Sequence, residues 1–220
     1  MTTPRDLLIA ALDAEAGGDP VPTGDLSLAL AGAELIDLLT TAAVRLDDGR
    51  IVAGTYGPTP TDRLLEEAAA SLATAEPFEP VGDFLWRRGE NLAQTYLAAF
   101  EAEELVVRQG KNPLRKGRWA LADSPSRRHA TERAASAEPV LRTLAEEVGI
   151  GHRPAQGASG TRGASSAAGA SATSDASYVD SEDAETVLAA VHDALLELEA
   201  VRQRRGIEQA AFDNIWRGLE

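Results

Sequence analysis

The stretch ALAGAELIDLLTTAAVRLDDGRIV, residues 29–52, decides the fold because the spacing of its apolar residues changes half-way along it. Leu28, just before the stretch, and Leu35 and Ile36 within it recur at the spacing of one helical face. Towards its end, apolar and polar residues alternate on either side of Asp48-Gly49, a dipeptide typical of tight turns. The stretch therefore predicts a helix, capped by Thr23 or Asp25, that is followed by a short β-hairpin.

Helical patterns continue on both sides of this stretch. Upstream, Thr3-Pro4 is typical of a helix start and Gly17-Gly18 of a helix end. Downstream, a loop rich in proline and threonine leads into LLEEAAASL, residues 64–72. A further pattern runs over residues 81–105, as one long helix or as two helices that meet near Gly89. Helices that pack through small residues are also favoured by an aromatic content of only 5%.

A second hairpin is expected over residues 105–122, where strand-like runs flank GKNPLRK. Its tip is basic in a chain whose formal net charge is −14. The segment RQGKNPLRKGRW contains no acidic residue and five basic ones, which are Arg108, Lys111, Arg115, Lys116 and Arg118. Such a tip is explained by a solvated turn, by a wing that contacts nucleic acid, or by a contact to an anionic membrane. We expect a mainly α fold: a single helical domain with a central helix bundle, one short β-hairpin and one protruding basic β-hairpin.

The last third of the chain has a different composition. A helix is expected from Ser124-Pro125, and Pro139 divides it. Residues 151–180 are rich in Ala, Ser and Gly and predict a flexible linker between a main domain, residues 1–150, and C-terminal helices, residues 181–220. Two apolar stripes predict a pair of helices that dock on the main domain; they comprise Val187, Val191, Leu195, Leu198 and Val201, and then Ile207, Ala211, Ile215 and Leu219.

The sequence contains no pattern that indicates catalysis, a metal or a cofactor. There is no cysteine, and the three histidines, at 129, 152 and 192, lack metal-ligand spacing. No phosphate-binding glycine loop and no nucleophile elbow is found. Paired acids such as Glu66-Glu67 are typical of solvated helix faces. We therefore expect no enzymatic activity, no catalytic residue and no cofactor.

Charge and hydropathy restrict the partners and the location. The acidic balance opposes generic binding to nucleic acid, and the helix before the basic hairpin carries Glu90, Glu101, Glu103 and Glu104 but no Lys or Arg. A winged-helix regulator is therefore the weakest alternative. No signal peptide and no apolar run of about 20 residues is found, so we expect a cytoplasmic protein.

Five segments, taken in order, resemble the Golgi phosphoprotein 3 family, including its bacterial members. They are LLIAALDAEAGG, ALAGAELIDLLTTAAVRLDDGRIV, PTPTDRLLEEAAASL, LAQTYLAAFEAEELV and VVRQGKNPLRKGRWAL. The resemblance covers about residues 4–150 and 183–219. It implies a non-enzymatic peripheral membrane protein that binds phosphatidylinositol 4-phosphate. For eukaryotic members it also implies adaptor activity for membrane enzymes and self-association through the hairpin.

The residues of this family's lipid pocket are not found at the matching positions. The family has a tryptophan and three arginines there, and an ungapped comparison places them at Pro22, Ala31, Glu90 and Ala93. We therefore expect anionic lipid or phosphoinositide to contact Arg87, Arg88 and the five hairpin bases, with the protein peripheral at the membrane. The alternative is a soluble protein-interaction module that binds a protein partner or itself through the 105–122 hairpin.

Overall fold

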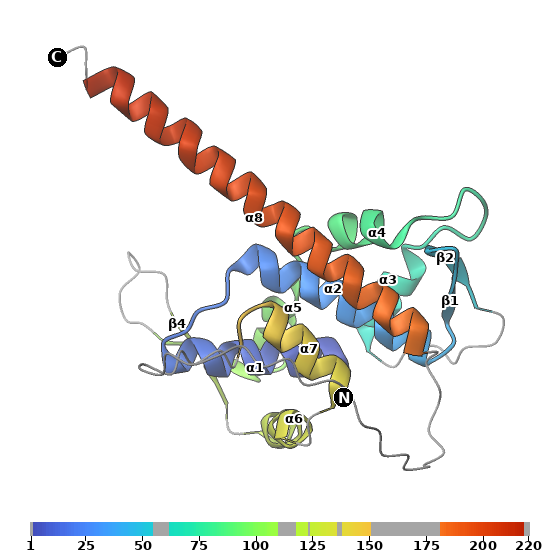
Figure 1. Ribbon diagram of the computed structural model, residues 1–220. Helices are drawn as coiled ribbons and strands as arrows, with labels where there is room; N and C mark the ends of the chain where they lie inside the picture. The colour runs from blue at the N-terminus through green and yellow to red at the C-terminus, as the bar shows by residue number, and fades with distance from the viewer. Residues whose placement is uncertain are drawn as a thin grey trace, which may run out of the picture.

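The structure is a computed structural model that describes residues 2–54, 62–109, 118–122, 124–135, 138–150 and 181–217. These residues form helices and two small antiparallel sheets, arranged as shown in Figure 1. The elements are α1 (Thr3–Gly17), α2 (Thr23–Thr40), β1 (Val44–Asp47), β2 (Arg50–Ala53), α3 (Arg63–Ala70), α4 (Val81–Arg88), α5 (Leu92–Ala102), β3 (Val106–Gln109), β4 (Arg118–Leu121), α6 (Pro125–Ala135), α7 (Pro139–Glu147) and α8 (Ser181–Arg217). The predicted mainly α fold is confirmed.

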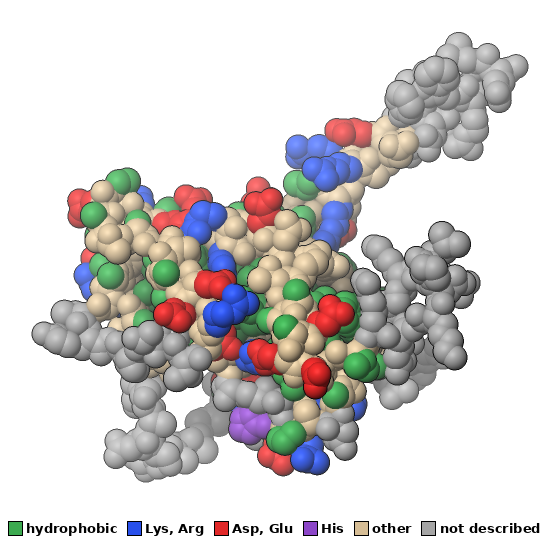
Figure 2. Space-filling model, turned by 180° about the vertical axis from the view of Figure 1, so that it is seen from behind, with side chains coloured by type: hydrophobic (Ala, Val, Ile, Leu, Met, Phe, Trp, Pro, Cys, Tyr) green, Lys and Arg blue, Asp and Glu red, His purple; other side chains and the backbone are tan. Residues whose placement is uncertain are grey.

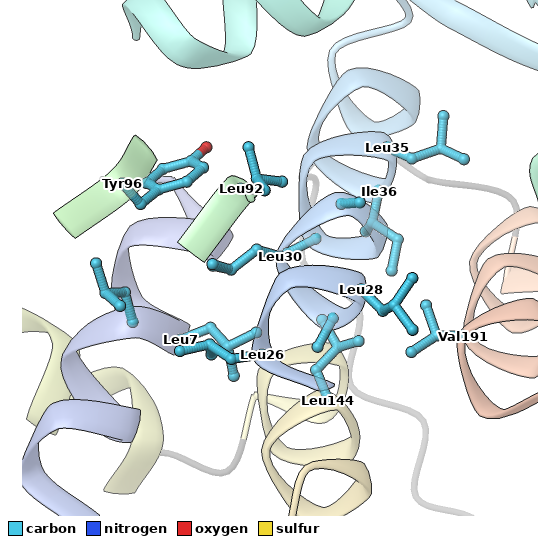
Figure 3. Packing of buried hydrophobic residues seen from close by; sticks show 14 of the residues in the cluster. Leu7, Leu26, Leu28, Leu30, Leu35, Ile36, Leu92, Tyr96, Leu144 and Val191 are labelled. Carbon is cyan, nitrogen blue, oxygen red and sulfur yellow. The ribbon is translucent and has the colours of Figure 1, made fainter. Parts of the chain in front are cut away.

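Helix α2 is the centre of the bundle. Nearly all of it from Leu26 to Leu39 is buried, and α1, α3, α4, α5, α7 and α8 all pack against it. A helix that is apolar all round needs such cover on every side. Figure 3 shows the packing: side chains of α2 meet Leu7 of α1, Leu92 and Tyr96 of α5, Leu144 of α7 and Val191 of α8. The segment that decides the fold in the sequence is thus also the core of the structure.

The predicted Asp48-Gly49 turn forms at the expected place. In the first hairpin Asp47 pairs with Arg50, and the turn residues Asp48 and Gly49 both have positive φ, 48° and 71°. This is the backbone that a two-residue hairpin turn requires and that Asp-Gly adopts readily. Over residues 81–105 the sequence allows one long helix or two, and the structure has two, α4 and α5, which meet near Gly89. A side chain at Gly89 would lie 2.5 Å from the Leu85 carbonyl oxygen, so the close passage of the chain there requires glycine.

The predicted pair of C-terminal helices is wrong, because α8 is one continuous helix from Ser181 to Arg217. Gly206 does not end it, since a lone glycine costs a helix only about 1 kcal/mol relative to alanine and no proline follows. The first part docks on α2 and α4, with Val187 and Val191 fully buried. The predicted docking of the second stripe is also wrong where the structure describes side chains, since Ile207 is 71% exposed. In Figure 1 this end of α8 projects from the bundle.

Candidate functional site

The β3–β4 hairpin carries two of the five predicted basic residues on its described strands. Val106 pairs with Leu121 next to the core and is buried, whereas Gln109 pairs with Arg118 at the far end of the described ladder. Arg108 and Arg118 lie on these strands, and their side chains are outside the described residues. Lys111, Arg115 and Lys116 fall wholly outside them, in the segment that joins the strands. The register therefore places the backbones of Arg108 and Arg118 in the part of the described ladder that follows the buried Val106–Leu121 pair, and it places none of the other three bases.

Arg87, at the C-terminal end of α4, is paired with a carboxylate on the surface. Its guanidinium donates two hydrogen bonds of 2.6 Å to the carboxylate oxygens of Glu79. It also lies over the ring of Phe84, 5.6 Å from the centroid. The hydrogen bond to Glu79 raises the pKa of Arg87. With its side chain 44% exposed, Arg87 still reaches solvent, but its charge is matched by a neighbour.

Arg88 points in the opposite direction and belongs to a buried polar network. Its Nε and Nη2 atoms lie 2.7 and 2.9 Å from the two carboxylate oxygens of Glu34, whose side chain is fully buried. Nη2 also donates to the Leu64 carbonyl oxygen at 2.9 Å, and the Tyr96 hydroxyl donates to Glu34 Oε1 at 2.9 Å. The network therefore joins α2, α3, α4 and α5.

The electrostatics of this network follow from its burial. Burial raises the pKa of the Glu34 carboxyl, and the bonds from Arg88 and Tyr96 act in the opposite direction. Burial alone would lower the pKa of Arg88, but the bidentate pair with Glu34 outweighs it and holds the guanidinium charged. Burial and the Glu34 carboxylate together raise the pKa of Tyr96, so its hydroxyl remains a donor. Sequence reasoning missed this network, although a single glutamate inside an apolar helix was its visible signal.

The four positions of the family's lipid pocket partly come together. Ala93 of α5 donates its backbone N–H to Ser27 Oγ of α2 at 3.1 Å, and Ala31 lies one helical turn after Ser27. Ala31 and Ala93 are both fully or almost fully buried, and Glu90 is exposed. The α2–α5 contact is thus closed by small apolar residues. No arginine fork for a phosphate is present at these four positions.

Most described arginines are paired with an acid of the same chain. Arg5 bonds Asp62 and Glu103, Arg133 bonds Asp6 and Glu138, and Arg202 of α8 bonds Asp25 of α2. Among the side chains that the structure describes, the arginines without an ion pair are Arg50, Arg128, Arg204 and Arg205. These pairs explain how a chain of net charge −14 keeps few uncompensated cations on the described surface.

Two further features of the described residues bear on function. No group of three or more His, Cys, Asp or Glu side chains that could hold a metal ion occurs in the part of the chain that is described. Within the same part, no helix has the length and apolar character needed to cross a membrane.

Comparison with known proteins gives one match. The model of a protein family described as Golgi phosphoprotein 3 (GPP34) matches residues 4–205. The match includes the central bundle, both hairpins and the docked part of α8, and it ends one residue before Gly206. No curated protein and no solved structure matches the chain.

Proposed function

The chain belongs to the Golgi phosphoprotein 3 family, and from this premise we propose that it is a non-enzymatic module that binds anionic lipid surfaces through its β3–β4 hairpin. The observation that carries the proposal is the position of the basic segment. Five basic residues and no acid lie between Arg108 and Trp119, in the sequence segment that joins β3 to β4. The protein would then be peripheral to a membrane, with the helical bundle outside the lipid.

The magnitude of the attraction is adequate for reversible binding. Each basic residue next to an anionic surface contributes about 1 kcal/mol, so five contribute up to about 5 kcal/mol. The net charge of −14 opposes approach, but charges more than about 8 Å apart are largely screened at physiological salt. In this proposal the basic segment attracts lipid locally while the bundle remains acidic, and binding weakens as salt increases.

In this proposal Arg87 and Arg88 are secondary to the hairpin bases. Arg88 could reach a lipid phosphate only by leaving Glu34, which would then be a buried charge without a partner. Arg87 could do so only by exchanging Glu79 for the phosphate. The hairpin bases thus supply the attraction, and Arg88 holds four helices together.

The proposal also concerns selectivity. Recognition of one phosphoinositide headgroup needs fixed bidentate donors, and Ala31, Glu90 and Ala93 supply none. We therefore propose that binding depends on the charge density of the lipid surface rather than on phosphatidylinositol 4-phosphate itself. DNA binding is not proposed, because α5 carries no basic residue and buries Leu92, Tyr96 and Phe100 in the core.

The test is co-sedimentation with vesicles of neutral phosphatidylcholine, and with vesicles of equal charge density made with phosphatidylglycerol or with phosphatidylinositol 4-phosphate. We expect the full chain to bind both anionic vesicles about equally at low salt and to release them as salt increases. Changing Arg115, Lys116 and Arg118 together to Ser should abolish most of this binding.

The matched control removes three charges elsewhere. Arg45, Arg63 and Arg142 are exposed arginines. Changing all three to Ser gives the same net charge as the first triple variant and leaves the β3–β4 hairpin unchanged. This control should still bind vesicles. Failure of the unmodified chain to bind at low salt would refute the lipid proposal and favour a protein-interaction module. Equal losses by the two triple variants would refute the role of the hairpin.

A further inference from the structure

A cavity beside the first hairpin has no part in the proposed function. It is open to solvent, has a volume of about 510 Å³, and is lined among the described residues by Arg50, Glu76, Pro77 and Phe78. Arg50 begins β2, whereas the other three residues belong to the loop that precedes α4. A volume of about 300–1,000 Å³ is typical of small-molecule sites. The cavity is therefore large enough for a small ligand.

The strand and the loop that line this cavity are joined by hydrogen bonds. The Ile51 N–H donates to the Glu79 carbonyl oxygen at 2.9 Å, and Arg50 forms an antiparallel bridge with Pro80. The Arg50 side chain makes a further link, because its Nη1 atom donates to the Phe78 carbonyl oxygen at 2.7 Å. The guanidinium is thus held against the loop, at the cavity that both segments line.

Arg50 keeps most of its hydrogen-bonding capacity for another partner. A guanidinium has five N–H donors, and the structure shows one of them in use, on the carbonyl oxygen of the loop. Two neighbouring carboxylates are already paired with other arginines, Asp47 with Arg45 and Glu79 with Arg87. Figure 2 shows the usual pattern on one face of the molecule, where many basic side chains lie beside acidic ones. Arg50 departs from this pattern, since it has no ion pair among the described side chains.

Glu76 is the second unmatched charge of the cavity. It is exposed and, like Arg50, forms no ion pair with any side chain that the structure describes. The two residues line the same cavity but do not pair with each other, so a space separates their charged groups. A simple anion in that space would be repelled by Glu76, and a simple cation would be repelled by Arg50. A ligand that carries both charges would satisfy both residues.

We propose that this cavity binds a small zwitterion, with its phosphate or carboxylate group on Arg50 and its ammonium group on Glu76. A guanidinium matches either anion with two parallel hydrogen bonds. Pro77 and Phe78 contribute the apolar part of the lining, which suits the short carbon chain between the two charges. Such a ligand is a free small molecule or the headgroup of a zwitterionic phospholipid. None of the four residues belongs to the basic hairpin segment, so the inference does not rest on the proposed function.

The test is isothermal titration calorimetry of the full chain with glycerophosphoethanolamine and with β-alanine, which carry both charges. Ethanolamine and dimethyl phosphate carry one charge each and serve as the ligand controls. We expect a Kd of about 1 mM or below for at least one zwitterion, and binding that is at least about tenfold weaker for both single-charge compounds. No binding of either zwitterion, or equal affinity for a zwitterion and a single-charge compound, would overturn the proposal.

Two variants test the assigned residues. Arg50→Gln and Glu76→Gln should each weaken binding of the zwitterion at least about tenfold. The matched controls are Arg63→Gln and Glu67→Gln, which remove the same charges from an exposed ion pair of α3 outside the described lining, and they should bind normally. Circular dichroism shows whether each variant is folded. A folded Glu76→Gln variant that binds normally would contradict the assignment, and so would equal losses in the variants and the controls.

A further measurement identifies the source of the ligand. Vesicles of phosphatidylcholine and of phosphatidylethanolamine carry zwitterionic headgroups. Co-sedimentation that is lost in Glu76→Gln would assign the site to such a headgroup, and binding of the soluble zwitterion without co-sedimentation would assign it to a free small molecule. The triple hairpin variant at Arg115, Lys116 and Arg118 should bind the soluble zwitterion unchanged. Failure of this proposal and failure of the proposed function are therefore distinguishable.

Discussion

Replacing Arg88 with glutamine tests whether this arginine stabilises the bundle or contacts lipid. In the folded chain Arg88 is the charged partner of Glu34, which is fully buried and bonds Tyr96 as well. The neutral amide of the Arg88→Gln variant could not supply a charge, so Glu34 would have to remain buried as a carboxylate without a cation or take up a proton. Either state costs stability, and neither requires lipid to be present.

The expected loss is large because the pair is buried. Removing one partner of a buried ion pair typically costs about 3–5 kcal/mol. For a chain of this length each kcal/mol corresponds to roughly 2–4 °C, so the melting temperature should fall by roughly 6–20 °C. The matched control is Arg87→Gln at the next position. Its pair with Glu79 is 44% exposed on the arginine side and should contribute less than about 1 kcal/mol.

Urea unfolding followed by circular dichroism measures these losses. In a double-mutant cycle, the variant with both Glu34→Gln and Arg88→Gln should lose less stability than the two single variants lose in sum, because no buried charge is left.

The pH dependence of the stability loss has a defined sign. Burial raises the pKa of Glu34 above its ordinary value of 4.5, so this carboxyl favours the folded state as pH falls and disfavours it as pH rises. Without Arg88 that pKa rises further, and the deficit of Arg88→Gln should shrink between neutral pH and about pH 5. A deficit below about 1 kcal/mol, or one that does not change with pH, would refute a structural role for this ion pair.

Two other predictions concern the docking of α8. Gly32→Ala should destabilise the protein by about 1–3 kcal/mol in urea unfolding, because the added Cβ would lie 2.4 Å from Val191 Cγ2. The further change Val191→Ala should recover part of this loss. Equal stability of Gly32→Ala and the unmodified chain would contradict this packing. His192 Nδ1 of α8 lies 2.8 Å from Glu147 Oε2 of α7, and this hydrogen bond raises the pKa of His192 above its ordinary value of 6.5. This pair should therefore stabilise the protein below about pH 6.5, and its contribution should disappear as pH rises through the raised pKa. Melting temperatures of the unmodified chain and of His192→Gln should differ at about pH 6 and converge by about pH 8, and a constant difference would argue against the pair.

The features that sequence predicts well are local ones. The Asp48-Gly49 turn depends on two residues whose backbone preferences are intrinsic, and it forms as expected. Burial of α2 follows from its composition, because a helix apolar on all sides has few alternatives to the core. The continuity of α8 was not predictable in the same way. Gly206 is compatible with a helix end and with a helix interior, and the choice depends on whether the bundle offers space for a second docked helix.

The environments of the candidate site residues were likewise only partly predictable from the sequence. Arg87 and Arg88 are equivalent in the sequence, yet one is a surface residue and the other enters the core. The difference is made by Glu34, which is 54 residues away from Arg88 and becomes its neighbour only when α2 and α4 pack. The strands that flank the basic segment were easier to predict, because the pairing of β3 with β4 is local in the sequence.

A headgroup pocket and a basic hairpin are separable means of contacting a membrane, and this chain has the residues for only one of them. Ala31 is fully buried on α2, and Ala93 lies on α5 where its backbone bonds Ser27. An arginine at either position would have to enter a closed helix contact, and overpacking of that kind costs about 1–3 kcal/mol before the charge is considered. A single arginine substitution could therefore not create the pocket without displacing α2 from α5. The proposed hairpin contact needs no such change, because its five bases are already present in the sequence between Arg108 and Arg118. Under the proposed function, the chain therefore contacts a membrane through its charge and lacks the arginines for a selective contact to one lipid headgroup.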